Sequence, residues 1–267
     1  MKKIFSLLLS QLLLVGALFT TSCSKDDEIH TPIPQEIQTF TVNGVSFNMM
    51  LVKAGTFTMG ATPEQQDPNR GEKPAHRVTL THDYYMGETE VTQALWYAVM
   101  GSNPSYVKGD HLPVEKVSWY DCQEFVGRLS ELTGRVFRLP TEAEWEFAAR
   151  GGNNSRGYQY AGSNNLDEVA WYCDNRTQHV KSKRPNELGL YDMSGNVFEW
   201  CQDWEGDYCS ESQTDPTGPG PAADASRRMA RGGSFCDGAW YCRVACRVDY
   251  SPNDHNFRYG LRLALSE

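Results

Sequence analysis

Basic side chains and histidines are scarce in this sequence, and several common catalytic motifs are absent. Lysine and arginine together number 25 against 34 aspartates and glutamates, which gives a formal net charge of −9. An acidic chain of this kind lacks the positive surface that binds nucleic acid, so we expect no nucleic-acid partner. The six histidines show neither H-x-x-x-H nor H-E-x-x-H spacing, and no G-x-S-x-G turn or phosphate-binding loop occurs. The sequence therefore gives no support to zinc-hydrolase, serine-hydrolase or nucleotide chemistry.

The sequence also lacks an apolar run long enough to span a membrane. Lys2 and Lys3 precede an apolar stretch over residues 4–19, which is short for a spanning helix and typical of a signal peptide, here residues 1–22. "TTSC" resembles a lipobox in which Cys23 becomes the lipidated N-terminus, and "CSKDDE" resembles the export signal of Bacteroidetes surface lipoproteins. An ordinary signal peptide with an incidental cysteine is the alternative.

Residues 23–37 are polar and contain prolines, as expected of a lipidated tether. We therefore expect an outer membrane lipoprotein of the cell envelope, attached to the membrane only through its N-terminal lipid. The domain would face either the periplasm or the cell surface.

Residues 38–267 are expected to form one domain with little regular secondary structure, since no repeat is visible and glycine and proline recur throughout. Apolar spacing and capping residues predict three helices. The first lies within 89–101, the second begins at Ser118 and ends at Gly134, and the third opens with a capping box of Thr141 and Glu144. Short strands are expected at 57–60, 76–80 and 258–265, whereas residues 151–230 show almost no periodic pattern.

Cysteine usage leaves the chemistry open. After lipidation of Cys23, seven cysteines remain, and an odd number leaves at least one without a disulfide partner. Cys236, Cys242 and Cys246 lie together in "RGGSFCDGAWYCRVACR" (231–247), where they could be redox or metal ligands, disulfide partners or small buried side chains. Cys122 lies on the apolar stripe of the second helix and is predicted to be buried.

Seven phrases in one order give the chain a family resemblance. They are "VKAGTFTMG", "ETEVTQALW", "PVEKVSWYDCQEFVGRLSELTG", "FRLPTEAEWEFAARGG", "PNELGLYDMSGNVFEWCQDW", "RGGSF" and "RYGLRLAL". Together they resemble the sulfatase-modifying-factor, or formylglycine-generating enzyme, family over residues 47–265. The resemblance implies an α+β fold related to C-type lectins, and enzymes that oxidise a cysteine of a client sulfatase to formylglycine with dioxygen and copper(I).

The resemblance implies a copper(I) site built from two cysteines, and the sequence departs from it at one of them. In the family these thiols follow the serine of "GGS" by three and by eight residues, and copper(I) prefers soft thiolate ligands. Counted from Ser234, Cys242 matches the second position, but Asp237 occupies the first and Cys236 lies one residue earlier. In an extended strand that shift would turn the side chain to the opposite face, whereas a bulge would restore it.

Ser234, Cys236 and Cys242 are accordingly the candidate catalytic residues. The structural alternative is a disulfide that involves at least one of Cys201, Cys209, Cys236 and Cys246, with Cys242 buried.

"MSGNVFEW" matches a calcium site of the family. Asn196, Val197 and Glu199 offer hard oxygen ligands of the kind that calcium prefers. A structural turn with a surface glutamate is the alternative. Trp200 and Tyr241 match residues that line the family's peptide groove beside Ser234, and both could instead be core aromatics.

Two functional hypotheses remain. The first is an exported oxidase that generates formylglycine in a client protein. The second is a non-catalytic relative that holds a peptide, a glycan or an envelope partner in the same groove. The replacement of the second thiol by Asp237 favours the second hypothesis, while the retained Cys242 and Ser234 keep the first one open.

Overall fold

The computed structural model describes residues 36–220 and 226–266. The predicted signal peptide, Cys23 and residues 23–35 of the tether lie outside the described residues. Within the described ranges, no helix is both long and apolar enough to cross a membrane.

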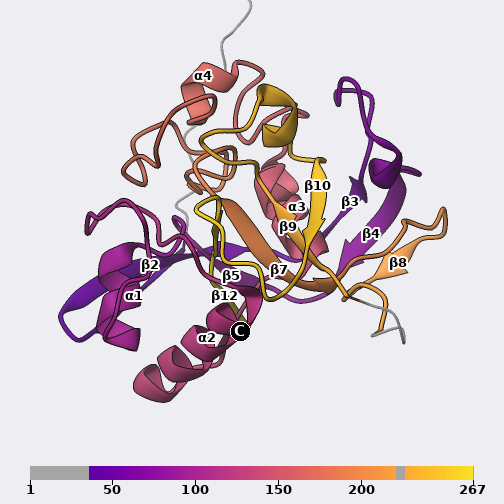
Figure 1. The fold of residues 1–267 in the computed structure, drawn as a ribbon. Helices are drawn as coiled ribbons and strands as arrows, with labels where there is room; N and C mark the ends of the chain where they lie inside the picture. The colour runs from indigo at the N-terminus through magenta and orange to yellow at the C-terminus, as the bar shows by residue number, and fades with distance from the viewer. Residues whose placement is uncertain (1–35, 221–225, 267) are drawn as a thin grey trace, which may run out of the picture. The chain divides into compact units, whose positions relative to one another are not determined.

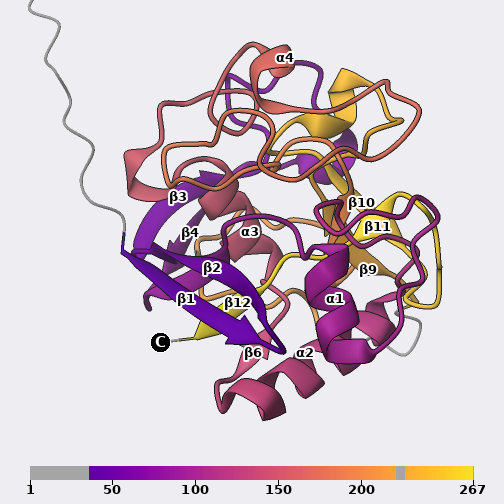
Figure 2. The same cartoon turned by 90° about the vertical axis from the view of Figure 1, so that its left-hand side faces the viewer.

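Three sheets form the framework (Figures 1 and 2). The five-stranded sheet is antiparallel, with the order β1 (Ile37–Val42), β2 (Val45–Val52), β5 (Tyr84–Gly87), β12 (Ala264–Ser266) and β6 (Phe137–Arg138). The four-stranded sheet has the order β10 (Arg247–Tyr250), β9 (Arg228–Arg231), β7 (Phe198–Trp204) and β11 (Tyr259–Gly260). The smallest sheet joins β3 (Gly55–Met59), β4 (His76–Leu80) and β8 (Gln213–Thr214).

The five-stranded sheet separates two apolar cores. Successive side chains of a strand point to opposite faces, and along β2 Met49 packs into one core while Met50 packs into the other. The first core includes side chains from α1 (Gln93–Met100) and α2 (Trp119–Thr133). The second includes side chains from α3 (Glu142–Ala149). The central strand β5 is thus buried on both faces, whereas the edge strand β1 is partly exposed.

The three predicted helices are confirmed. The residues that cap their ends act on backbone groups nearby in the sequence, so these ends could be predicted. Ser118 caps α2 in a capping box, and Gly134 ends it in the left-handed conformation (φ 68°) that glycine adopts without strain. Thr141 and Glu144 form the predicted capping box of α3. Cys122 is buried as expected, whereas Leu132 in the last turn of α2 is 54% exposed.

The predicted strands are also found, with one division. The run at 76–80 is β4 and the run at 57–60 overlaps β3, but 258–265 divides into β11 and β12, which belong to different sheets. Strand β7 was not expected. It is buried on both faces over most of its length, so its sequence does not alternate between apolar and polar residues.

Long loops that carry two short helical turns gather on one side of the sheets. Figures 1 and 2 both place α4 (Leu166–Val169) and the 3-10 turn η3 (Ala239–Cys242) in this layer. Two further 3-10 turns, η1 (Arg70–Glu72) and η2 (Gly152–Asn154), lie in other loops.

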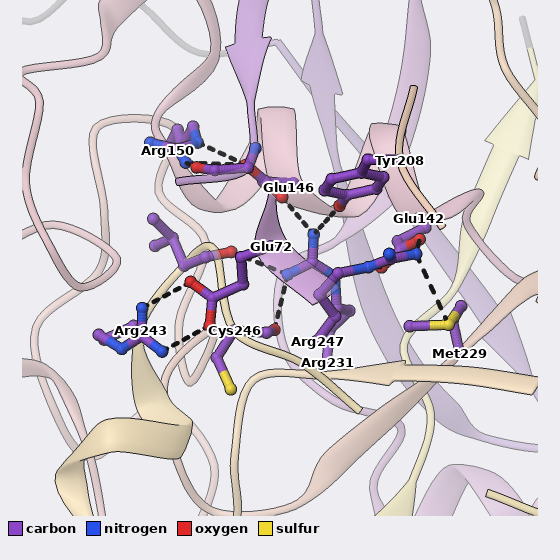
Figure 3. A network of polar contacts seen from close by, with 12 residues as sticks. Glu72, Glu142, Glu146, Arg150, Tyr208, Met229, Arg231, Arg243, Cys246 and Arg247 are labelled. Atoms are coloured by element: carbon purple, nitrogen blue, oxygen red, sulfur yellow. Dashed lines mark hydrogen bonds and ion pairs between the residues drawn. The ribbon is translucent and has the colours of Figure 1, made fainter. Parts of the chain in front are cut away.

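Buried ion pairs fix the segment before and after η3, as Figure 3 shows. The Arg243 guanidinium donates two hydrogen bonds to Glu72, at 2.7 and 2.6 Å, and both side chains are at most 1% exposed. Arg247 pairs with Glu142 at 2.6 Å, and Arg231 pairs with Glu146. Arg243, Arg247 and Arg262 alternate with apolar residues in the sequence, which predicts buried or partly buried ion pairs, and the structure confirms these pairs. The Arg243–Glu72 pair joins the segment after η3 to η1.

Candidate functional site

Residues 234–237 form a tight turn. The Asp237 N–H donates to the Ser234 carbonyl at 3.1 Å, and the Phe235 N–H donates to the Asn196 carbonyl at 2.8 Å. The segment is therefore neither the extended strand nor the bulge considered from the sequence. Cys236 lies at the centre of the turn with an exposed side chain, while Ser234 is buried. Cys236 is thus the exposed residue of the turn.

Asp237 occupies the inner side of this turn. Its carboxylate accepts a hydrogen bond from the Ser234 hydroxyl and pairs with the Arg258 guanidinium at 3.1 Å. The Cys236 sulfur lies 3.6 Å from the same hydroxyl. Ser234 therefore contacts both the carboxylate at the family's thiol position and the displaced thiol.

Cys242 lies in a different environment. It is fully buried and packs with Leu166 and Val169. Burial, and after it the neighbouring Cys246, Asp237 and Cys173, raise the pKa of the Cys242 thiol well above its usual value. This side chain is consequently a neutral thiol at physiological pH.

The cysteines of the described ranges are all free. The expected disulfide among Cys201, Cys209, Cys236 and Cys246 is not formed, and Cys201 and Cys246 are instead buried thiols. Burial raises the pKa of Cys246 to about 12.

The two candidate thiols do not fit a two-thiolate copper(I) centre in this arrangement. Such a centre needs two soft ligands that converge on the ion. Cys242 is buried and neutral, Cys236 faces outwards, and the carboxylate of Asp237 is a hard ligand that is already paired. No group of three or more metal-ligating side chains occurs elsewhere in the part of the chain that the structure describes.

The predicted calcium ligands are bonded to protein groups. Both Glu199 carboxylate oxygens accept hydrogen bonds from Arg262, the shortest at 2.7 Å, and one also accepts from the Trp145 indole at 2.6 Å. The Asn196 side-chain oxygen accepts from the Gln178 N–H at 3.0 Å. A guanidinium beside the carboxylate opposes a divalent cation, so these side chains do not fit calcium as they are arranged.

The buried Glu90 side chain stabilises the turn that contains Asn196 and Val197. Its carboxylate accepts hydrogen bonds from the Asn196 side-chain amide at 2.7 Å and from the Val197 N–H at 3.0 Å. Burial first, and then the charges of Asp192 and Glu199, raise the pKa of Glu90 well above its usual value. The turn is thus stabilised by a buried side chain that is far from it in the sequence.

The two predicted groove aromatics lie in different places. Trp200 is fully buried in the first core and donates to the Val117 carbonyl at 3.1 Å, so its assignment to a groove is corrected to the core. Tyr241 is 36% exposed in η3, and its ring meets Phe198 edge-on with the centroids 6.2 Å apart. Of the pair, Tyr241 is the one that reaches solvent at the candidate site.

Several residues at the site were not identified from the sequence. The Cys173 N–H donates to the Asp237 carbonyl at 3.0 Å, and Arg258 pairs with the Asp237 carboxylate. Beside the turn, a pocket of about 320 Å³ includes Glu115, Thr177 and Cys236 in its lining. These residues come from separate loops with no shared motif, so no sequence signal joins them.

The comparisons with known proteins agree with this fold. A sequence model of the sulfatase-modifying factor enzyme 1-like domain matches residues 35–267. The chain is 37% identical to the formylglycine-generating enzyme of Streptomyces coelicolor, over 79% of this chain and 86% of that protein. It is 33% identical to chaperone protein LppX of Paenibacillus barcinonensis, over 84% of this chain and 91% of that protein.

A solved structure gives the same result. Treponema denticola variable protein 1 matches with a TM-score of 0.77 and 35% identity, over 86% of this chain and 99% of that chain. The predicted α+β fold, related to C-type lectins, is confirmed.

Proposed function

The chain belongs to the sulfatase-modifying factor enzyme 1-like family, and we propose that it binds a protein client at the turn of residues 234–237 without oxidising a client cysteine to formylglycine. One observation carries the proposal. Asp237 stands at the family's thiol position, hydrogen-bonded to Ser234 and paired with Arg258, while Cys236 is exposed and Cys242 is buried.

The electrostatics of Cys242 support the same reading. The charge of Asp237 contributes to the raised pKa of the Cys242 thiol, so the side chain at position 237 lies close enough to act on that sulfur. A carboxylate there opposes thiolate formation at Cys242, whereas a thiol could share a copper(I) ion with it. Aspartate at position 237 thus removes one copper(I) ligand, and its charge opposes the thiolate form of the other ligand, Cys242.

A protein partner is favoured over other ligands by the relatives and by the surface. One relative is named a chaperone and another a formylglycine-generating enzyme, and both names fit a polypeptide partner. Tyr106 and Phe257 are exposed and line one pocket together with Phe235, and a cluster of exposed apolar side chains marks an interaction site.

The oxidase remains the second candidate. It is favoured by the retained Ser234 and Cys242 and by the 37% identity to a relative named for that activity. For this chain to act as an oxidase, the turn at 234–237 would have to rearrange so that Cys236 meets Cys242.

We test the choice with a sulfatase-type peptide that contains the client cysteine. The purified chain is supplied with copper(I) and dioxygen, formylglycine is measured by mass spectrometry, and peptide binding is measured by fluorescence anisotropy. We expect binding without conversion, weaker binding after Tyr241→Ala, and conversion only after Asp237→Cys. Turnover by the unaltered chain that disappears after Cys236→Ala would establish the oxidase instead, and failure to bind the peptide would remove the binding role.

We also propose that the domain is exported as an outer membrane lipoprotein attached at Cys23, which the opening sequence "MKKIFSLLLSQLLLVGALFTTSC" supports. Cys23→Ser removes the acylation site and should release the protein from the membrane fraction. Protease added to intact cells then distinguishes the surface from the periplasm. Retention of Cys23→Ser in the membrane fraction would contradict lipid attachment at this residue.

A further inference from the structure

The pocket beside the turn, which we call the Cys236 pocket, is open and mostly apolar. It encloses about 320 Å³, and Tyr106, Phe235, Phe257 and the Cys236 thiol are among the side chains that line it. The rings of Phe235 and Phe257 lie 6.0 Å apart, and Phe257 is 46% exposed. Aromatic walls of this kind favour an apolar group of a ligand.

Two buried side chains in the lining have an oxygen without a partner. Thr177 is 2% exposed and Glu115 is 1% exposed. The Thr177 hydroxyl and one Glu115 carboxylate oxygen have no hydrogen-bond partner among the described residues. The other Glu115 oxygen accepts from the N–H groups of Tyr106 and Val107. Because buried polar groups are normally paired, these two oxygens indicate a ligand that donates hydrogen bonds.

The thiol at this pocket has a favourable setting for reaction. Cys236 is exposed and free at the corner of the turn, and its sulfur lies 3.6 Å from the Ser234 hydroxyl. Arg258, which pairs with Asp237, also lies within electrostatic range of the Cys236 sulfur. An accessible, unpaired thiol in the lining of a pocket can be reached by the disulfide of a bound partner.

The other exposed cysteines lack this combination. Cys173 is held against the Asp237 carbonyl, with a sulfur–oxygen distance of 3.5 Å. Cys209 lines a different cavity, together with Asp203 and Asp207. Neither of these cysteines lines the Cys236 pocket, so both provide internal controls.

We propose that Cys236 is an exchange site for a polypeptide disulfide that carries an apolar residue beside one of its sulfurs. The apolar side chain enters the Cys236 pocket, and backbone N–H groups next to it donate to Thr177 and Glu115. The Cys236 thiolate attacks the adjacent sulfur, so a new S–S bond forms as the partner's S–S bond breaks. The other partner sulfur leaves as a thiolate and takes up a proton. The exchange conserves the number of disulfides and needs no external oxidant.

This inference goes beyond the proposed binding role, because exchange at Cys236 is measurable without any client protein. The test uses two neutral disulfides, the aromatic 4,4′-dithiodipyridine and the aliphatic 2-hydroxyethyl disulfide. The purified, reduced chain reacts with each, and quenched samples are mapped by mass spectrometry to give a rate for every cysteine. Dividing the Cys236 rate by the Cys173 rate cancels the intrinsic reactivity of each probe.

We expect this rate ratio to be at least about tenfold higher with the aromatic probe than with the aliphatic one, because only the aromatic probe fills the pocket. Phe257→Ala should remove most of that preference. Tyr97→Ala, which truncates an exposed aromatic of α1 outside the pocket lining, should retain it. Equal ratios for the two probes would overturn the role of the pocket, and a Cys236 that reacts more slowly than Cys173 with both would overturn the exchange site.

Discussion

Two of the arginine–carboxylate pairs that involve the segment 231–247 differ in their surroundings. Arg243 and Glu72 are at most 1% exposed and share two short hydrogen bonds. In the other pair Asp237 is 11% exposed and Arg258 is 28% exposed, with one contact at 3.1 Å. The first pair lies inside the protein and fixes the loop. The second pair lies at the surface, beside a pocket whose walls have unsatisfied oxygens.

The difference separates two roles within one stretch of chain. A buried, fully paired network specifies one conformation and leaves no atom for a ligand. The surface pair of Asp237 and Arg258, beside the free thiol of Cys236, leaves polar and reactive groups available to a ligand. The following predictions test this separation.

The largest effect on the free energy of unfolding is expected at the buried Arg243–Glu72 pair. Glu72→Ala leaves the Arg243 guanidinium buried without its carboxylate, and breaking a buried pair costs about 3–5 kcal/mol of unfolding free energy. Asp237→Ala at the surface pair should cost about 1 kcal/mol or less. Urea denaturation of both variants measures the difference. Similar losses for the two variants would show that the surface pair is as important for folding as the buried one.

A smaller effect is expected on the pH dependence of the unfolding free energy, through Asp203, which is hydrogen-bonded to Glu142 of the buried ion pairs. Asp203 accepts the Glu142 N–H at 2.8 Å, and burial, followed by the Glu142 charge, raises the pKa of Asp203 to about 8. Because the folded state holds this proton more tightly than the unfolded state, the contribution to stability is complete below about pH 4 and is lost as the pH rises to about 8.

Asp203→Asn mimics the protonated carboxyl and should flatten that decline by at least about 1 kcal/mol. Denaturation midpoints at pH 5 and pH 8 provide the measurement. A decline that is equally steep in the variant would show that Asp203 is ionised in the folded protein at both values.

No effect is expected from calcium. Since Arg262 occupies the Glu199 carboxylate, adding a chelator or adding calcium should leave the melting temperature unchanged. A melting temperature that rises with calcium, and no longer does so after Glu199→Ala, would show that the ion displaces the guanidinium and that the family's calcium site is retained.

The sequence predicts the elements whose signals are local. Ser118 and Gly134 mark the ends of α2 because the cap residues satisfy backbone groups only a few residues away. The buried arginine pairs were also anticipated, since charges among apolar residues need partners when they are buried.

The site was less predictable because its geometry depends on contacts between distant residues. Whether Cys236 or Asp237 faces Cys242 is decided by one turn, and sequence spacing alone cannot distinguish a turn from a strand or a bulge. Trp200 shows the same limit, since its residue type suits both a groove and a core. The pocket could not be found at all, because Glu115 and Thr177 meet Cys236 only in the folded chain.

The most direct test of the account is a copper(I) titration against a coloured copper(I) chelator. The central claim is that Cys236 and Cys242 are separate thiols and that Asp237 occupies the place of the missing ligand. The unaltered chain should therefore leave the chelator complex intact, whereas Asp237→Cys should withdraw a stoichiometric amount of copper. Stoichiometric withdrawal by the unaltered chain, lost on either Cys236→Ala or Cys242→Ala, would show that the two thiols meet around copper and would contradict the account.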